Sequence, residues 1–422
     1  MKSVVFVLIF LLSDLIAEDL VKVNADLRLS YLNYEYEDNW FSDSRAGIAS
    51  AKLSATTQVW NNLYAKVSFV AVEGMNHDKS KQGMSYVFSE GWNGVHDSFA
   101  LLEESYIGYK NSILSLKVGR QEMELPFIHS DDYFVVPNSF EAMTLEFTPS
   151  QKLTLHLGHV SRMSGTWDSS YDGADFHSMS RQAWIHYANT TKDTYPITEI
   201  YNIVGDQGIS YAGVIYTRME HAIQVWDFYA HETFNTIMLQ YDYTSHNYYA
   251  GLQYSTKRDI GKLKDSPLYR VHYDVYGAKI GAKIAEKWNM ELAYTGVSDD
   301  DSLHYLGSWG GYPEFASGML LSYFETYLRD ADIYAITSKH TLDNLAKGLS
   351  LKFQYARYEL NKDYTINVPK ESPNGDGYMN AYGVQVFYQY NKNLSLKMAF
   401  AGRELENRNN SNLVRAVMKY SF

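Results

Sequence analysis

The segment GAKIGAKI, residues 277–284, alternates strictly between two kinds of side chain. Successive side chains of an extended strand point to opposite faces, so the alanines and isoleucines share one face while Lys279 and Lys283 share the other with two glycines. A helix, with its period of about 3.6 residues, would mix the two sets. The segment therefore predicts a β-strand with one apolar face and one cationic face.

The same period of two recurs along most of the chain, for example in residues 23–31, 49–56 and 63–71. Apolar residues alternate there with polar ones, which is typical of strands that have one face in water. The pattern predicts eighteen strands, with sixteen as the alternative. They are expected at residues 23–33, 46–58, 63–73, 101–109, 113–121, 142–147, 152–162, 208–217, 222–230, 236–243, 248–257, 275–284, 289–297, 332–339, 349–358, 381–390, 394–403 and 412–422.

Two kinds of connection join these expected strands. Short ones, with turn residues such as Asn and Pro, lie near 60–62, 110–112, 148–150 and 391–393. Long ones lie near 74–98, 122–141, 163–207, 298–331 and 359–380. A membrane β-barrel has short turns on its periplasmic side and long loops outside, so this division favours a barrel over a soluble sandwich.

The charge on the polar faces indicates which side of the sheet meets water. Arg28, Lys52 and Lys66 occupy the polar faces of their strands, as Lys279 does, and a dry core could not hold that much charge. A closed sheet of sixteen to eighteen strands instead leaves a water-filled lumen. We therefore expect an all-β fold, a transmembrane antiparallel up-and-down β-barrel whose apolar side chains face lipid.

Composition excludes several classes of protein. The chain of 422 residues has a net charge of −12, which argues against nucleic acid as a partner. It has no cysteine, which excludes disulfides, thiolate metal sites and cysteine nucleophiles. His231-Glu232 begins a zinc-protease motif, but the fifth position is Asn235 rather than His. We expect no catalytic residue, no metal site and no cofactor, and therefore not an enzyme.

The two ends of the chain differ from the strands between them. Residues 1–17 have a positive start, an apolar run from Val4 to Leu12 and a small residue at Ala17, the order of a secretory signal peptide. We expect residues 18–422 to form a single barrel domain. The last strand alternates and ends on Phe422, which resembles the aromatic C-terminal signature of Gram-negative outer-membrane barrels and implies the barrel-assembly machinery as a partner.

A more specific resemblance lies between Leu116 and Phe147. The segment contains Gly119-Arg120-Gln121, then Pro126, Asp131 and Pro137-Asn138-Ser139-Phe140-Glu141. It resembles the OprD-type porins, the substrate-selective carboxylate channels of outer membranes, and Ser308–Pro313 resembles a second, weaker element of that family. Tyr133-Phe134 stands where many members have Arg, and Ala142 where Gly is common. Specificity for basic substrates therefore should not be carried over.

The resemblance implies an eighteen-stranded barrel whose third extracellular loop folds inward as a constriction. On this chain that loop is 122–141, and its expected constriction residues are Glu122, Glu124, Asp131, Asp132, Asn138 and Glu141. The resemblance and the strand pattern together place cations in the lumen. The expected pore-lining residues are Arg28, Lys52, Lys66, Lys117, Arg120, Lys257, Lys279, Lys283, Lys352, Lys397, Arg415 and Lys419.

A narrow bore lined by charge of one sign concentrates counter-ions. We therefore expect a porin in the outer membrane of a Gram-negative bacterium, surrounded by lipid, through which small hydrophilic solutes diffuse passively, with anions and carboxylates favoured. Two other functions stay open: an outer-membrane barrel enzyme of phospholipase or protease type, and a surface-displayed structural or adhesive barrel. Also open are whether the lumen charges only keep the bore wet, whether the chain forms a homotrimer, and whether Asp299–Asp301 binds a cation.

Overall fold

The computed structural model describes residues 20–37, 44–75, 99–130, 136–164, 176–182, 205–265, 270–300, 308–317, 329–360, 377–406 and 408–422. The expected signal peptide, residues 1–17, lies outside these ranges. The long strands are β1 (Val21–Tyr36), β2 (Ser44–Thr57), β3 (Leu63–Met75), β4 (Phe99–Lys110), β5 (Leu114–Gln121), β6 (Ser139–Ser150), β7 (Leu153–Ser164), β9 (Ile209–Arg218), β10 (His221–Ala230), β11 (Phe234–Thr244), β12 (Tyr248–Asp259), β13 (His272–Ala285), β14 (Trp288–Val297), β15 (Asp332–Thr341), β16 (Leu349–Leu360), β17 (Gly377–Gln389), β18 (Leu394–Leu405) and β19 (Arg408–Ser421). Between them lie the two-residue strand β8 (His177–Ser178) and two four-residue helices, α3 (Met179–Gln182) and α6 (Gly261–Lys264). Within the described ranges, no helix is long and apolar enough to cross a membrane.

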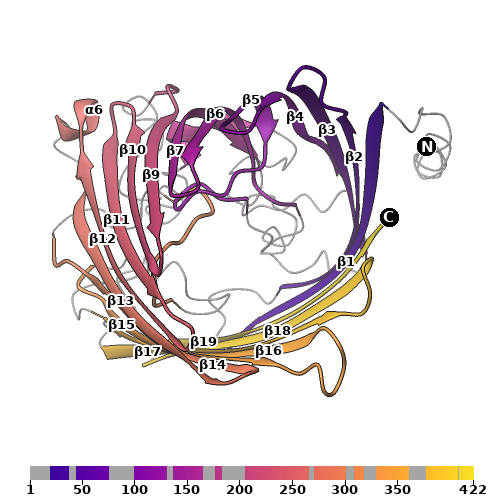
Figure 1. Cartoon of the computed structure of the whole chain (residues 1–422). Helices are drawn as coiled ribbons and strands as arrows, with labels where there is room; N and C mark the ends of the chain where they lie inside the picture. The colour runs from indigo at the N-terminus through magenta and orange to yellow at the C-terminus, as the bar shows by residue number, and fades with distance from the viewer. Residues whose placement is uncertain are drawn as a thin grey trace.

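The long strands form one closed antiparallel sheet of eighteen strands, seen along its axis in Figure 1. Each strand pairs with its neighbours in sequence, and β7 pairs directly with β9 because β8 adds only two residues at the end of β7. β1 pairs with β2 on one edge and with β19 on the other, so Tyr31 faces both Gly47 and Ala416. Closure leaves no free sheet edge, which is what a sheet needs in lipid. The expected barrel of eighteen strands is confirmed.

The two ends of the barrel carry different connections. At one end, the turn end, two to seven residues join the strands, as at 111–113, 151–152 and 219–220. At the other end, the loop end, the connections include 122–138 and 298–331. Three connections at the loop end are nevertheless no longer than seven residues, 37–43, 231–233 and 406–407, which the expected alternation did not include. β1 starts and β19 stops at the turn end, so both termini of the sheet lie there.

The connection from β2 to β3 shows how the sequence produces a tight turn. Trp60 and Leu63 pair across it, and the two residues between them, Asn61 and Asn62, have positive φ angles of 50° and 69°. Asn enters this left-handed region more readily than most residues, and a two-residue turn with both φ positive matches the twist of the flanking strands. The Asn-Asn pair therefore closes the hairpin.

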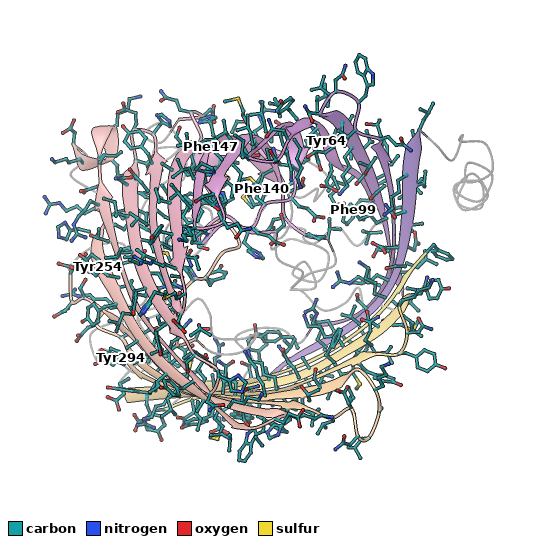
Figure 2. The ribbon with its side chains drawn as sticks, viewed as in Figure 1. Tyr64, Phe99, Phe140, Phe147, Tyr254 and Tyr294 are labelled. Carbon is teal, nitrogen blue, oxygen red and sulfur yellow. The ribbon has the colours of Figure 1, made fainter. Side chains whose placement is uncertain are left out.

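Apolar side chains cover the outer face of the sheet. Ile107 and Ile280 are 66% and 59% exposed. Figure 2 shows Tyr254 and Tyr294 outside the ring, whereas Phe140 projects inside it. A continuous apolar surface of this extent is rare on a soluble protein and is the surface that a barrel presents to lipid.

The inner face changes character along the barrel axis, which alternation alone did not predict. Toward the turn end, β3 carries Lys66 and Ser68 on this face. Toward the loop end the same row continues with Val70 and Val72, which are 4% and 2% exposed. Buried apolar residues form three clusters. They include residues of the interstrand segments, which fold into the lumen and pack against the wall.

Replacing Ile280 by Arg should destabilise the barrel by about 2–4 kcal/mol, because the charge would face hydrocarbon. The matched control is Gln354→Arg on the lumen face of β16, which should change the free energy of unfolding by less than about 0.5 kcal/mol. Urea unfolding in phospholipid vesicles, followed by heat-modifiable mobility, measures both variants. Equal losses would mean that Ile280 does not face lipid.

Candidate functional site

The candidate site is the part of the lumen that interstrand segments fill. The described parts of the β5–β6 loop, residues 122–130 and 136–138, lie inside the ring (Figure 1). Its apolar residues Phe127 and Ile128 are 1% and 0% exposed, so the loop packs into the lumen instead of standing in solvent. The inward fold expected for this loop is therefore present.

A second inward segment, residues 308–317 between β14 and β15, pairs with this loop. The Trp309 N–H donates to Phe127 O at 2.7 Å, and the His129 N–H donates to Trp309 O at 3.0 Å. Gly311 lies against Pro126, where a Cβ would come within 2.2 Å of the backbone oxygen, so a larger residue would push the two segments apart. The motif that resembled a weaker family element is thus the backbone partner of the β5–β6 loop.

The indole of Trp309 joins three interstrand segments. It is 1% exposed and stacks on Phe234 of β11, with the ring centroids 6.0 Å apart. Its Nε1 donates to the backbone oxygen of Met179 in α3 at 3.2 Å. Segments from the β5–β6, β7–β9 and β14–β15 connections therefore meet around one side chain. No pattern in the sequence could indicate that these partners come from three separate places.

A buried cation completes this packing. Lys257 of β12 is 3% exposed, and its Nζ lies 5.3–5.5 Å from the ring centroids of Phe127, Phe234 and Tyr273. An ammonium close to aromatic faces is stabilised by the negative potential of the rings, and Glu314 supplies an opposite charge. Lys257 therefore holds the β5–β6 loop against the wall and is closed off from the open bore.

The rest of the 308–317 segment runs along the inner wall. Gln253 of β12 donates to Pro313 O at 2.9 Å, and the Ala316 N–H donates to Thr295 Oγ1 of β14 at 3.0 Å. Two connections therefore narrow the lumen, whereas the sequence indicated only one. The second was missed because nothing in its composition separates it from a solvated loop.

Charged side chains gather where the β5–β6 loop leaves the wall. Lys52 Nζ lies 2.7 Å from Glu103 and 2.6 Å from Glu122, and Lys66 forms an ion pair with Glu104. The ligand oxygens of the three glutamates lie within 4.8 Å of one another. The Lys52 ammonium already lies among them, so this cluster gives no reason to expect a metal ion.

A β-bulge brings two of these glutamates to the same face. Opposite β3, Ser68 pairs with Glu104 while the next residue, Phe69, pairs with Leu102. Glu103 is the extra residue of a bulge, and it faces inward beside Glu104 instead of alternating with it. Strict alternation would have sent the Glu103 carboxylate toward lipid.

Several expected pore-lining cations have partners on the wall. Lys279 lies 3.0 Å from Asp242 and 4.1 Å above the ring of Phe315, and Lys419 lies 3.1 Å from Asp26. These pairs reduce the charge that the two lysines present to the bore. The others contact neutral groups or are covered: Lys117 lies 5.3 Å from the ring of Tyr106, Arg28 donates to Ser30 at 3.2 Å, and Arg415 is 4% exposed.

The lysines on β13 to β18 form a more open cationic surface. Lys339 and Lys352 are direct neighbours across the sheet, and the register continues from Lys339 through Asn289 to Lys283. Lys397 is a further positive charge acting on Lys352. Within the part of the chain that the structure describes, Lys283, Lys339 and Lys352 form no ion pair within 4.0 Å. Lys339 was missed because it is the last residue of its expected strand.

Arg120 and Glu141 were predicted in the lumen, and the strand register places both in the outward row of the wall. The Arg120 guanidinium nevertheless lies over the ring of Phe176, 3.9 Å from its centroid, and Phe176 packs against the inner-wall cluster that contains Ile48 and Val70. β6 begins at Ser139, three residues before the expected strand, so Glu141 belongs to β6 and pairs in register with Arg120. Their row continues with Val118 and Met143, which are 49% and 55% exposed. Strict alternation along the strand from Lys117 already places Arg120 in the outward row. The prediction followed the resemblance of the GRQ motif instead of this alternation, and the alternation gives the observed register.

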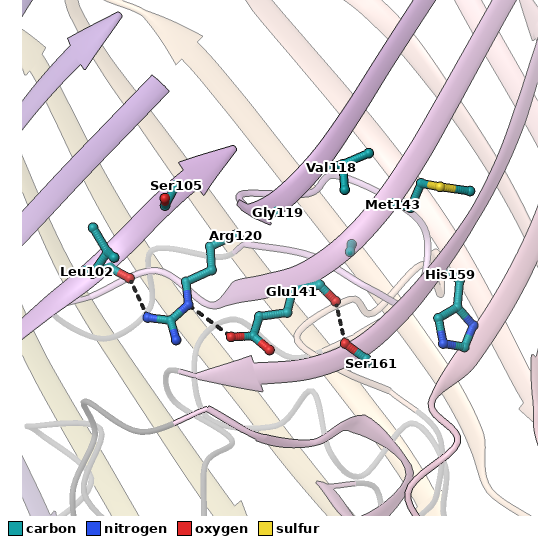
Figure 3. A pocket seen from close by; sticks show the side chains of 10 residues that line it. Leu102, Ser105, Val118, Gly119, Arg120, Glu141, Met143, His159 and Ser161 are labelled. Carbon is teal, nitrogen blue, oxygen red and sulfur yellow. Dashed lines mark hydrogen bonds and ion pairs between the residues drawn. The ribbon is translucent and has the colours of Figure 1, made fainter. Parts of the chain in front are cut away.

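The side chain of Arg120 closes the place where β5 ends. Its Nε donates to Glu141 at 3.0 Å and its Nη1 donates to Leu102 O at 3.3 Å, as Figure 3 shows. β5 stops at Gln121, so this part of β4 has no strand partner on that side. The Arg of the GRQ motif therefore satisfies a backbone carbonyl that the sheet leaves without a partner.

The remaining expected loop residues are placed only in part. Asn138 is buried and donates to His129 O at 3.0 Å, while Glu124 is exposed. Asp131 and Asp132 lie outside the described residues.

The acidic run in the β14–β15 connection has protein partners. Asp299 pairs with Arg329 at 2.6 Å, and Asp300 accepts from Ser298 at 2.6 Å. Asp301 lies outside the described residues. These contacts occupy oxygens that a cation would need.

Comparisons with known proteins agree with this geometry. A family model described as outer membrane porin, OprD family, matches residues 107–327. Similar solved structures include OccK9 (OpdG) of Pseudomonas aeruginosa, 16% identical with a TM-score of 0.74, OpdK of the same species with vanillate, 15% and 0.72, and OccAB4 of Acinetobacter baumannii, 11% and 0.71. Each alignment covers 95% of this chain and 98% of the other. At such identities the likeness shows the fold. No curated protein matches the sequence.

Trp309→Ala should release the inward segments, because truncating a fully buried indole removes about 3–5 kcal/mol of packing. We expect a larger single-channel conductance and more current noise in planar bilayers. The matched control is Trp60→Ala in the turn after β2, where the indole is 73% exposed, and it should leave both unchanged. Wild-type conductance in the Trp309 variant would contradict the role given to the indole.

The foot of the β5–β6 loop should respond to acid. Burial raises the pKa of Glu122, but the Lys52 ammonium, a hydrogen bond with Glu103 and the charge of Lys66 together lower it by more, so the pKa lies below its ordinary value. The contact with Lys52 is therefore present at neutral pH and is lost only as the pH falls through this lowered pKa, in more acid solution than an ordinary glutamate requires.

We expect wild-type channel noise to stay constant from neutral pH to about pH 5 and to rise in more acid solution. Glu122→Gln should be noisy throughout, and Glu124→Gln, which changes an exposed carboxylate of the same loop, should behave as wild type. Single-channel recording across this range is the measurement. Wild-type noise in Glu122→Gln, or increased noise in Glu124→Gln, would contradict the role given to the Lys52–Glu122 contact.

Proposed function

Because the chain belongs to the OprD family of outer-membrane porins, we propose that its bore favours anions, carboxylates among them, over cations. As a porin it lies in the outer membrane of a Gram-negative bacterium and lets small hydrophilic solutes diffuse through passively. The charge preference is a property of this chain's own lumen and is argued from its residues.

The cationic surface on β13 to β16 carries the proposal. Lys283, Lys339 and Lys352 face the lumen, and none of them forms an ion pair among the residues that the structure describes. In a water-filled bore, one unit charge at ~7 Å is worth about 0.6 kcal/mol before screening by salt. Each charge attracts an anion and repels a cation, so after screening by physiological salt it separates the two by about 0.5 kcal/mol, and three such charges favour an anion by a factor on the order of ten.

The acidic groups at the constriction do not cancel this preference. The ammonium groups of Lys52 and Lys66 lie among Glu103, Glu104 and Glu122 and offset most of their negative charge. The surface of Lys283, Lys339 and Lys352 carries three positive charges, which Glu291, an acidic group that acts on Lys352, offsets only in part. The constriction therefore modulates an anion preference that the wall produces.

A solved relative supports the carboxylate part of the proposal. OpdK of Pseudomonas aeruginosa was determined with vanillate, which is a carboxylate. A carboxylate entering this bore would meet the ammonium groups of Lys283, Lys339 and Lys352, which form no ion pair within 4.0 Å with a described residue. Charge-assisted hydrogen bonds to such groups are among the stronger ones.

The proposal also covers the export, membrane insertion and assembly of the chain. Transport involves no chemical step and no cofactor or metal. Residues 1–17 direct export and are removed, residues 18–422 form the barrel, and the last strand, ending at Phe422, is the part that the barrel-assembly machinery binds. The oligomeric state to be tested is a homotrimer against a monomer.

Reversing charge at Lys352 with Lys352→Glu should lower the anion-to-cation permeability ratio by at least about threefold, because each unit charge contributes about 0.6 kcal/mol. Lys339→Glu should act in the same direction. The control is Lys287→Glu in the turn between β13 and β14, where the lysine lies 3.9 Å from Asp343 and outside the bore.

Reversal potentials in planar bilayers with a salt gradient give the ratio. A cation-selective wild-type channel, or equal ratios in wild type and Lys352→Glu, would reject the assignment of selectivity to this surface. Hydrolysis of a phospholipid or peptide by the folded channel would favour an enzyme instead.

A further inference from the structure

The outer wall has a recess where β5 ends short of its neighbours. It is a cavity of about 540 Å³ bordered by β4, β5, β6 and β7. Figure 3 shows Val118, Met143, Arg120, Glu141, His159 and Ser161 around it. Val118 and Met143 belong to the outward row and are about half exposed, so the recess opens toward lipid and not into the bore.

Three irregularities produce this recess. β5 stops at Gln121, while β4 and β6 extend further toward the loop end. Gly119 has a φ of 129° and no side chain, and a Cβ there would lie 2.2 Å from the backbone oxygen of Ser105. β7 has a bulge at Ser161, since Glu141 pairs with Arg162 and Ala142 with Val160. A short strand, a glycine without a side chain and a bulge therefore meet at the recess.

The lining of the recess changes from apolar to polar in a fixed direction. Toward the loop end, the outward row of β5 passes from Val118 to Arg120, and that of β6 from Met143 to Glu141. The outward row of β7 likewise passes from Leu157 to His159. In this family the loop end faces outside the cell, so the order is that of an amphiphile in the outer leaflet, with its chains below and its headgroup above.

The rim of the recess has more positive than negative charge once Arg162 is included, which lies next to the lining residue Glu141 and does not itself line the recess. Arg120 and Arg162 lie 3.0 Å and 3.9 Å from the single carboxylate of Glu141, and the side chain of Arg162 is 59% exposed. Most of the Arg162 donors therefore remain available. His159 extends the polar surface through a chain of 3.0 Å hydrogen bonds to Ser210 and then His231.

Other outward-facing arginines near the loop end each pair with one carboxylate of their own. Arg258 makes two hydrogen bonds to Asp274, at 2.8 Å and 3.0 Å. Arg357 pairs with Glu359 at 3.7 Å and lies over the ring of Tyr378. Arg120 is satisfied in the same way, since it also donates to Leu102 O and lies 3.9 Å over the ring of Phe176. Arg162 differs, because it only shares Glu141 with Arg120, at 3.9 Å, and is 59% exposed, so its guanidinium favours an additional anion.

We propose that this recess binds the phosphorylated headgroup of an outer-leaflet glycolipid of the lipid A class. The phosphate accepts hydrogen bonds from Arg162 and the polar rim at His159. An acyl chain lies along Val118 and Met143. This function belongs to the outer surface and is independent of what passes through the bore.

The test uses the full chain in detergent and native mass spectrometry, with three probes: bis-phosphorylated lipid A, the same lipid after removal of its phosphates, and inorganic phosphate. Wild type should bind phosphorylated lipid A about tenfold more tightly than the dephosphorylated lipid, the worth of one charge-assisted hydrogen bond. Equal binding of the two lipids would overturn the proposal. Binding of inorganic phosphate as tight as that of lipid A would mean a free-anion site and would overturn the assignment to a lipid.

Arg162→Ala is the informative variant, because the side chain is exposed and its loss should not prevent folding, which heat-modifiable mobility verifies. It should bind phosphorylated lipid A about tenfold more weakly and the dephosphorylated lipid as wild type does. Arg357→Ala removes an outward-facing arginine that already pairs with Glu359, on the other side of the barrel. It should change the affinity for neither the phosphorylated nor the dephosphorylated lipid. Wild-type lipid A binding by Arg162→Ala, or an equal loss in Arg357→Ala, would overturn the proposal.

Discussion

Lipid offers the backbone no hydrogen-bond partner, and this constraint decides the shape of the molecule. The pairing of β1 with β19 removes the last free edge of the sheet. A ring of eighteen strands then encloses more space than wall side chains can fill. The interstrand segments occupy that space, and they stay there because the inner wall turns apolar toward the loop end, as at Ile48 and Val70.

The strands and their two faces could be predicted from the sequence because a period of two is a local property. Lys279 and Ile280 are adjacent, and their opposite orientations need no knowledge of the rest of the chain. The exceptions come from contacts between distant segments. Glu103 faces inward because of a bulge against β3, and the partners of Trp309 are far away in sequence. Arg120 was predicted in the lumen because of the GRQ motif, although the alternation along its own strand places it in the outward row.

The wall also shows why a count of lumen charges does not give selectivity. Lys52 and Lys279 face inward like Lys352, but each lies within 3.0 Å of a carboxylate. Lys352 has a second lysine as its direct neighbour across the sheet. Residues of the same type, on the same face, thus differ in the charge that they present to a solute. Only the register and the bulges decide which of them are neutralised.

The contacts of Trp309 have a consequence for the order of folding. Its indole bonds to a residue 130 positions earlier in the chain, and its backbone pairs with the β5–β6 loop, which is further away still. Such non-local contacts carry a large loop-closure entropy until the intervening strands have assembled. The strands between Met179 and Trp309 should therefore assemble first, and the interior segments should pack against that part of the wall in a later step. A channel whose strands had assembled but whose interior segments had not yet packed would conduct ions without selecting among solutes.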